Sequence, residues 1–264
     1  MKTFQFLLPL LALTVSHSTA ALVAHWPLNT SAADTSGNGN NGNVVGSVVF
    51  GQAGANASTG TSAAFSGTGH IDVPWSAQLN PGTQAPNGSG SFSVAFWAFP
   101  TAVGGSHRSP FTNRADLTTS VNGPIVYIEP GGKWSLWGGN NGPSGTWHPT
   151  DSLAAVANTW THVGITYDAA STSRKLYLNG AEVLNQVQGI SANLVRDLHI
   201  GGGADDGNSF TWAGRIDDVG MWNNALTAAQ MQGVMTNGVV PEPSLTGLLA
   251  LSAGLLMRRR QRNR

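Results

Sequence analysis

The sequence of 264 residues contains no cysteine, which excludes disulfide bonds, thiolate metal sites and cysteine nucleophiles. Charged residues are scarce, at 10% of the chain, and only three residues are glutamate: Glu129, Glu182 and Glu242. The hydrophobic share of 41% is large enough for a sizeable core, which argues against a disordered chain. The 34 glycines favour tight turns over helix interiors, so a helical bundle is not expected.

The formal net charge of zero is the sum of unequal parts. Five arginines lie in the last seven residues, whereas the segment from Ala21 to Val240 contains seven basic and twelve acidic residues. This segment therefore carries a charge of about −5 and has no basic stripe, which predicts that nucleic acid is not a partner.

Residues 1–20 have the pattern of a secretory signal peptide. Lys2 supplies the positive charge, Phe4 to Val15 form an apolar run, and Ser18-Thr19-Ala20 place small residues before a cleavage point. We expect signal peptidase to remove this segment from an exported protein.

The C-terminal end combines three ordered elements. Val240-Pro241-Glu242-Pro243 is followed by an apolar run from Ser244 to Met257 and then by Arg258, Arg259 and Arg260. This order resembles the PEP-CTERM sorting signal of Gram-negative bacteria. The resemblance implies that an exosortase processes residues 238–264 at the inner membrane and delivers the protein to the cell surface or extracellular matrix. The fourteen-residue run is shorter than the roughly 17–25 residues of a membrane span, and an ordinary tail anchor is the alternative.

The remaining segment, residues 21–237, predicts one β-rich domain. Asn179-Gly180 lies between two apolar runs and predicts a hairpin with a type I′ turn. One helix is expected at Thr227–Met235, where Thr227 would cap it. Strands are predicted at Leu22–Trp26, Val44–Phe50, Ser62–Ser66, His70–Val73, Ser91–Phe99, Ile125–Glu129, Lys133–Trp137, Thr161–Tyr167, Lys175–Asn179, Leu198–Gly201 and Gly214–Trp222.

Several motifs occur along this segment in a fixed order. They include His25-Trp26-Pro27-Leu28, Phe92-Ser93-Val94-Ala95-Phe96-Trp97, Trp160-Thr161-His162-Val163, Leu176-Tyr177-Leu178-Asn179-Gly180 and Gly214-Arg215-Ile216-Asp217-Asp218-Val219. Together they resemble the laminin-G-like, concanavalin A-like jelly rolls. The resemblance implies an all-β antiparallel β-sandwich with its function in rim loops or on a concave face. Members include lectins, glycosidases and adhesion modules, so the fold leaves the function open.

Catalytic patterns are missing. The related endo-glucanases carry Glu-x-Asp-x-x-Glu or Glu-x-Asp-x-Glu on one strand, and none of the three glutamates here has such neighbours. Adjacent aspartates such as Asp205-Asp206 point to opposite faces of a strand and do not converge. The seven histidines show no His-x-His or His-x-x-x-His pair of the kind that binds zinc. The sequence therefore predicts a protein that is not an enzyme, with an atypical aspartate hydrolase as an alternative.

Calcium is the predicted cofactor, in a structural role. The turn that begins at Asp34 is rich in oxygen ligands, which calcium prefers. The resemblance implies that Asp34 and Asp217 approach each other, with Asn40 as a carbonyl donor. In the alternative, Asp34 only caps an Asx-turn and Asp217 pairs with Arg215 or a backbone amide.

Carbohydrate binding is the predicted function. Tryptophan rings stack on sugar rings, and acidic side chains accept hydrogen bonds from hydroxyls. A structural or adhesion protein that binds another protein is the alternative. The candidate ligand residues are Trp134, Trp137, Trp147 and Trp212, with Asp205 and Asp206, and the expected ligand is a glycan or extracellular polysaccharide.

Overall fold

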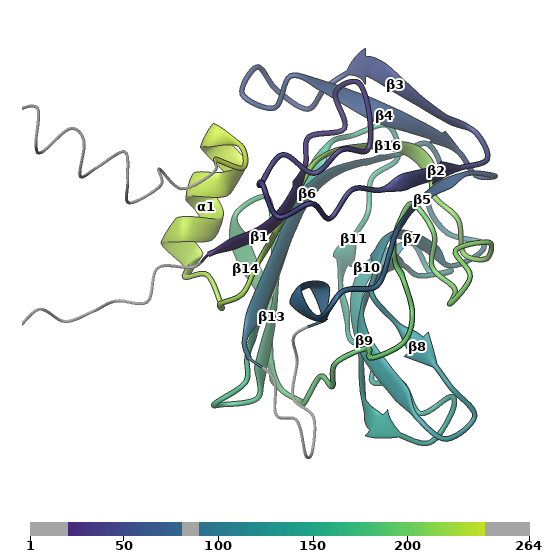
Figure 1. The fold of residues 1–264 in the computed structure, drawn as a ribbon, viewed down its shortest axis with the longest axis vertical. Helices are drawn as coiled ribbons and strands as arrows, with labels where there is room; N and C mark the ends of the chain where they lie inside the picture. Colours follow the sequence, from purple (N-terminus) through teal and green to yellow (C-terminus); the bar gives the residue numbers. More distant parts are fainter. Residues whose placement is uncertain (1–20, 81–89, 241–264) are drawn as a thin grey trace, which may run out of the picture.

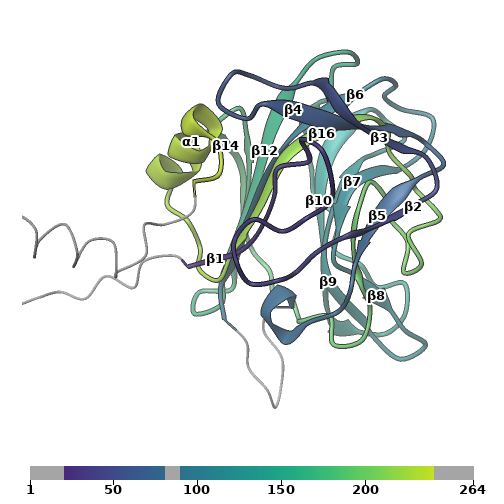
Figure 2. The same cartoon turned by 45° about the horizontal axis from the view of Figure 1, so that its top comes forward.

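The structure, a computed structural model, describes residues 21–80 and 90–240. Its strands form two antiparallel sheets that pack face to face, with one helix outside them (Figures 1 and 2). This arrangement confirms the predicted antiparallel β-sandwich jelly roll.

Each sheet has eight strands. The first sheet runs β14 (Ala181–Val187), β13 (Ser173–Leu178), β12 (Thr161–Asp168), β6 (Phe92–Pro100), β16 (Ala213–Trp222), β4 (Thr61–Ser66) and β3 (Val48–Ala53), and β1 (Leu22–Trp26) also pairs with β16. The second sheet runs β11 (Asp151–Ala154), β10 (Lys133–Gly142), β9 (Val121–Ile128), β7 (Arg108–Thr112), β15 (Leu198–Ile200), β5 (His70–Val73) and β2 (Asn43–Val45), and β8 (Ala115–Asp116) also pairs with β9. The helical elements in the described ranges are η1 (Ala77–Leu79) and α1 (Ala228–Asn237).

One hydrophobic core fills the space between the sheets, because alternate residues of each strand point inward. In β6, Val94 and Phe96 belong to this core, whereas Ala95 between them faces the opposite side. Trp134 of the second sheet stacks on Trp212 of the loop before β16, with ring centroids 6.2 Å apart. The core therefore ties both sheets into one unit.

Helix α1 covers the outer face of the first sheet. Thr227 accepts a hydrogen bond from the backbone N–H of Gln230, and the Gln230 side chain bonds back to the Thr227 backbone, which forms a capping box. Met231 is fully buried against Gly164 of β12, where a Cβ would lie 2.3 Å from the Met231 sulfur. The predicted helix and its Thr227 cap are confirmed.

The turns explain both the successes and the errors of the strand predictions. Asn179 and Gly180 have φ values of 50° and 77°, as the predicted type I′ hairpin requires. The single strand predicted over 44–50 is wrong: Gly46, with φ of 69°, breaks it into β2 and β3, which belong to different sheets. Strand β7 was not predicted because Pro110 interrupts its apolar pattern.

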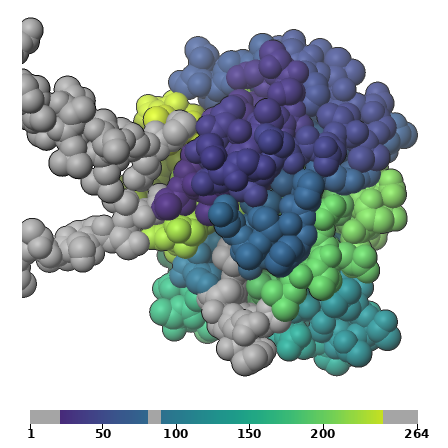
Figure 3. All heavy atoms as spheres, in the orientation of Figure 1, coloured from purple at the N-terminus to yellow at the C-terminus, as the bar shows by residue number. Residues whose placement is uncertain are grey.

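The segment between β1 and β2 lies on the surface, in purple, beside the blue segment that contains η1 (Figure 3). Within the described ranges, no helix is long and apolar enough to cross a membrane. The predicted signal peptide and residues 241–264 of the predicted sorting signal lie outside the described residues. Of the described start of that signal, Val239 is buried and Val240 is exposed.

Candidate ligand-binding site

A polar hollow of about 740 Å³ lies where the loop after β15 folds over the outer face of the second sheet. This face is opposite the core, because Leu198 and Ile200, which flank His199 in β15, belong to the core. The walls of the hollow come from β8, the loop after β10 and the loops on both sides of β15. The lining residues are Arg114, Asp116, Leu117, Thr118, Ser144, Arg196, Ala204, Asp205, Asp206 and Ser209.

Arg114 holds the hollow together from beneath. Its Nε donates to Asp205 Oδ1 and its Nη2 to Asp116 Oδ2, both at 2.8 Å. Its guanidinium carbon also lies 4.9 Å from the centroid of the Trp147 ring, in a cation–π contact. Arg114 is almost fully buried, and its two ion pairs connect the β8 region to the loop after β15.

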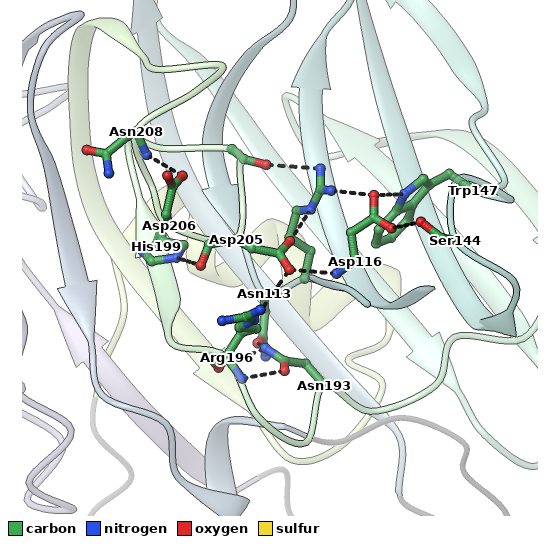
Figure 4. A network of polar contacts seen from close by, with 12 residues as sticks. Asn113, Asp116, Ser144, Trp147, Asn193, Arg196, His199, Asp205, Asp206 and Asn208 are labelled. Carbon is green, nitrogen blue, oxygen red and sulfur yellow. Dashed lines mark hydrogen bonds and ion pairs between the residues drawn. The ribbon is translucent and has the colours of Figure 1, made fainter. Parts of the chain in front are cut away.

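The two carboxylates bonded to Arg114 make further contacts (Figure 4). Asp205 Oδ2 accepts a hydrogen bond from the Asp116 backbone N–H at 2.8 Å and lies 3.4 Å from Arg196 Nε. Asp116 accepts hydrogen bonds from Ser144 Oγ at 3.0 Å and from Trp147 Nε1 at 3.2 Å. These contacts fix the side chains in place before any ligand arrives.

Exposed polar groups stand at the rim of this rigid network. The Arg196 side chain is 47% exposed. Asp206 and Asn208 are also exposed, and the backbone N–H of Asn208 donates to Asp206 Oδ1 at 3.0 Å. This hydrogen bond holds the pKa of Asp206 below its usual value, so the group is a carboxylate at neutral pH. The rim thus presents a guanidinium, a carboxylate and an amide to solvent.

The predicted tryptophans have three different environments. Trp147 contributes to the hollow through Asp116 and Arg114. Trp134 and Trp212 are 1% and 0% exposed and stack on each other in the core. Their predicted ligand role is therefore wrong, because a ring with no accessible face cannot stack on a sugar. The glycine-rich segments around them suggested exposure, but the opposite sheet covers both rings.

Trp137 belongs to an aromatic cluster on the same face of the sheet. Its Nε1 donates to Glu129 at 2.5 Å, and His107 Nε2 lies 2.7 Å from the other oxygen of Glu129. The rings of Trp137, His107 and Phe210 all contact Tyr127, and Phe210 is 42% exposed. This cluster offers an apolar surface beside the hollow.

Tyr127 connects the aromatic cluster with the hollow. Its hydroxyl donates to the backbone oxygen of Gly203 at 3.0 Å and accepts from Arg114 at 3.3 Å. Burial raises the pKa of Tyr127 to about 12, so the hydroxyl keeps its proton. The cluster and the hollow therefore share one supporting side chain, and a ligand crossing the Gly203–Phe210 loop would meet both.

The predicted calcium ligands Asp34 and Asn40 make hydrogen bonds within the first loop. Asp34 accepts backbone hydrogen bonds from His25, Ser36 and Asn40, which outweigh burial and lower its pKa. The Asn40 carbonyl accepts from Trp26 Nε1. These contacts match the Asx-turn alternative.

Asp217 differs from the other two predicted ligands. It is fully buried, and one oxygen accepts from Thr59 Oγ1 at 2.7 Å and from the Ala55 backbone N–H at 2.8 Å. Its other oxygen has no hydrogen-bond partner among the described residues. Burial raises the pKa of Asp217 to about 6. Asp217 therefore makes the backbone-amide contact of the alternative interpretation, and calcium stays a prediction.

Sequence reasoning found Trp147, Asp205 and Asp206 but missed Arg114, Asp116, Ser144 and Arg196. Arg114 and Asp205 are 91 positions apart, so only the pairing of the strands brings them together. The available signal was that Arg114 is one of only seven basic residues between Ala21 and Val240.

Two antiparallel sheets with a ligand-sized polar hollow beside them define a jelly roll of the lectin and glucanase type. A laminin G family model, described as the concanavalin A-like lectin/glucanases superfamily, matches residues 65–232. The chain belongs to this superfamily. A search of curated proteins gave no match.

Solved structures share the fold at low sequence identity. One is domain 4 of AbnA, a GH43 extracellular arabinanase from Geobacillus stearothermophilus, in complex with arabinotriose: 19% identity, TM-score 0.60, covering 82% of this chain and 98% of that one. Another is the binding domain of botulinum neurotoxin serotype G: 15% identity, TM-score 0.56, covering 81% and 50%. A third is the binding domain of Paraclostridial Mosquitocidal Protein 1: 15% identity, TM-score 0.54, covering 81% and 52%. This chain spans about half of each toxin binding domain.

Proposed function

We propose that the protein is an exported, non-catalytic carbohydrate-binding module, and that the hollow around Arg196 and Asp206 binds a glycan. The observation that carries this proposal is the exposed rim of Arg196, Asp206 and Asn208 above the buried Arg114 network. Sugars are bound by polar side chains held in fixed positions beside an aromatic surface. The likeness to an arabinanase domain in complex with arabinotriose supports the same class of ligand.

The charges of the hollow favour a neutral glycan. Its lining contains two arginines and three aspartates, and Arg114 is already paired with two of these carboxylates. The lining carries no net positive charge that would attract an acidic polysaccharide. Its arginine and aspartate side chains can donate hydrogen bonds to sugar hydroxyls and accept hydrogen bonds from them. We therefore propose a neutral polysaccharide such as an arabinan or a glucan.

The carboxylates of the described residues support the non-catalytic proposal. A glycoside hydrolase needs two carboxylates facing the scissile bond. Glu129 is engaged by Trp137 and His107, and Glu182 is engaged by Lys175 on a distant hairpin. Asp116 and Asp205 are both bonded to Arg114, which lies between them.

The decisive experiment is a glycan array on residues 21–240, followed by calorimetry with each polysaccharide that binds. We expect Arg196→Ala and Asp206→Asn each to weaken binding about tenfold or more, because each removes hydrogen bonds to charged groups. Lys175→Ala is the matched control: it removes an exposed ion-paired cation on the β13–β14 hairpin and should leave binding unchanged. Absence of binding to every glycan would overturn the proposal and favour a protein-binding role.

The same protein incubated with those polysaccharides tests the catalytic alternative. We expect no release of reducing sugar, and release that Asp205→Asn or Asp116→Asn abolishes would establish an atypical hydrolase.

Export is proposed from the two chain ends. The apolar run behind Lys2 supports signal peptidase processing, and the Val-Pro-Glu-Pro segment with its arginine end supports sorting by an exosortase to the cell surface or matrix. Cell fractionation tests this: deletion of residues 2–20 should retain the protein in the cytoplasm, and replacement of Arg258, Arg259 and Arg260 by alanine should alter its sorting. Unchanged distribution of both variants would contradict the proposal.

A further inference from the structure

Two histidines and one aspartate converge on the outer face of the second sheet. Asp72 of β5 stands opposite His199 of β15 in the antiparallel register, and His70 lies two residues before Asp72 on the same face. Their neighbours Ile71 and Leu198 point into the core. One ligand atom from each of the three residues lies within 4.8 Å of the other two.

The three side chains share a single carboxylate oxygen. His199 Nδ1 lies 2.7 Å from Asp72 Oδ1, and His70 Nε2 lies 2.9 Å from the same atom. Both histidines are 2% exposed, whereas the Asp72 side chain is 27% exposed. His70 Nε2 is buried and faces only this carboxylate oxygen, without meeting the geometry of a hydrogen bond. A buried imidazole nitrogen beside a carboxylate is a candidate metal ligand.

The second ring nitrogen of His199 faces a backbone oxygen. His199 Nε2 lies 3.3 Å from the backbone oxygen of Asp205, so the ring is oriented with its Nδ1 toward the Asp72 carboxylate. An imidazole held through its far nitrogen by a carbonyl oxygen is the usual arrangement of a metal ligand.

The loop after β15 closes over the three side chains. Gly207, with φ of 70°, packs so closely on the His70 ring that a Cβ would lie 2.3 Å from Nε2. The site is therefore covered by the backbone of this loop on one side.

We propose that His70, Asp72 and His199 bind one divalent transition-metal ion, zinc above all, with water as the fourth ligand. Imidazole nitrogens suit zinc, nickel and copper, whereas calcium requires oxygen ligands. Zinc lies about 2.0–2.1 Å from nitrogen in a tetrahedral site, which separates ligand atoms by roughly 3.3 Å. A shift of about half an ångström in the partly exposed Asp72 side chain brings its oxygen to this distance from both histidines.

This site goes beyond glycan binding, because it depends on different side chains and needs no sugar. It would nevertheless stabilise the loop that lines the hollow, because His199 Nε2 contacts the backbone oxygen of Asp205 in that loop. No zinc motif is visible in the sequence, because His199 lies 127 positions from Asp72.

The test is titration of chelator-treated full-length protein with zinc alone, by calorimetry, and with cobalt, by absorption spectroscopy. We expect one zinc per chain, and a cobalt spectrum of tetrahedral nitrogen and oxygen ligation. His70→Gln and His199→Gln should each weaken zinc binding about 100-fold, since loss of a supporting residue alone costs 10–100-fold. His107→Gln is the matched control, because His107 pairs with a single carboxylate on the same face and should not matter.

The cobalt spectrum of the unaltered protein keeps the proposal testable if a variant fails to fold. Calcium at the same concentration should leave the zinc titration unchanged. Equal zinc affinity in the His70, His199 and His107 variants would overturn the proposal, as would the absence of stoichiometric zinc in the unaltered protein.

Discussion

His162 illustrates how one buried residue sets a pH dependence. Its ring lies in β12, edge-on to Trp97 with centroids 5.1 Å apart, and is almost fully buried. Burial lowers the pKa of His162 to about 4, below the usual 6.5. The folded protein therefore keeps this ring neutral at pH values where the unfolded chain binds a proton.

We predict that His162 destabilises the protein in acid. Between pH 6.5 and about 4 the unfolded state takes up a proton that the folded state does not, so stability falls as the pH is lowered. The loss reaches about 3 kcal/mol, at 1.36 kcal/mol per pKa unit. Phenylalanine does not titrate, so His162→Phe should make the free energy of unfolding less dependent on pH. Urea unfolding from pH 4 to 8 measures this. An identical slope in both proteins would contradict the prediction, and His148→Phe, on an outer loop, is the control.

At the scale of elements, the predictions that were confirmed are those that depend on a few adjacent residues. The Asn179-Gly180 hairpin and the Thr227 cap depend on a few adjacent residues, so both could be recognised in the sequence. Strand β7 contains Pro110 and pairs with β9 and β15, which come later in the chain. Its strand character depends on these distant partners, and a local pattern cannot show them.

Helix α1 provides a prediction at this scale. Met231 is its fully buried residue and packs on the outer face of the first sheet with Ala95 and Trp222. Met231→Ala should lower the free energy of unfolding by about 2–5 kcal/mol, because it leaves a cavity over Gly164. Met235→Ala, in the last turns of the same helix and only half-buried, should cost less. Urea unfolding of both variants checks this, and equal losses would show that α1 is not anchored through Met231.

At the scale of the whole molecule, the sequence predicted the sandwich but only part of the site. Apolar stretches recur along the whole domain, so the prediction of a sandwich survives an error in any one strand. The hollow and the proposed metal site depend instead on single long-range pairs, Arg114 with Asp205 and Asp72 with His199. No spacing rule connects such residues before the sheet order is known. The predicted ligand role of Trp134 and Trp212 was wrong for the same reason, because contacts with the opposite sheet bury both rings.

The shared core predicts that both sheets unfold together. Trp212→Ala removes a buried ring that stacks on Trp134 of the second sheet while lying next to β16 of the first. We expect a loss of about 3–5 kcal/mol and one transition, coincident by tryptophan fluorescence and far-UV circular dichroism. Trp75→Ala, at an exposed ring, should cost far less. Two separate transitions in the Trp212 variant would show that the sheets are independent.

The position of β16 has a consequence for the order in which the molecule is assembled. This strand, at residues 213–222, lies between β6 and β4 and also pairs with β1. All three of its pairing partners therefore precede it in the chain. A ribosome or translocation channel releases the chain from its N-terminal end, and β1 finds its partner only after about 200 further residues have emerged. The first sheet can therefore be completed only late, when β16 emerges. A chain that ends before Trp222 lacks part of the strand that joins β6 to β4 and β1.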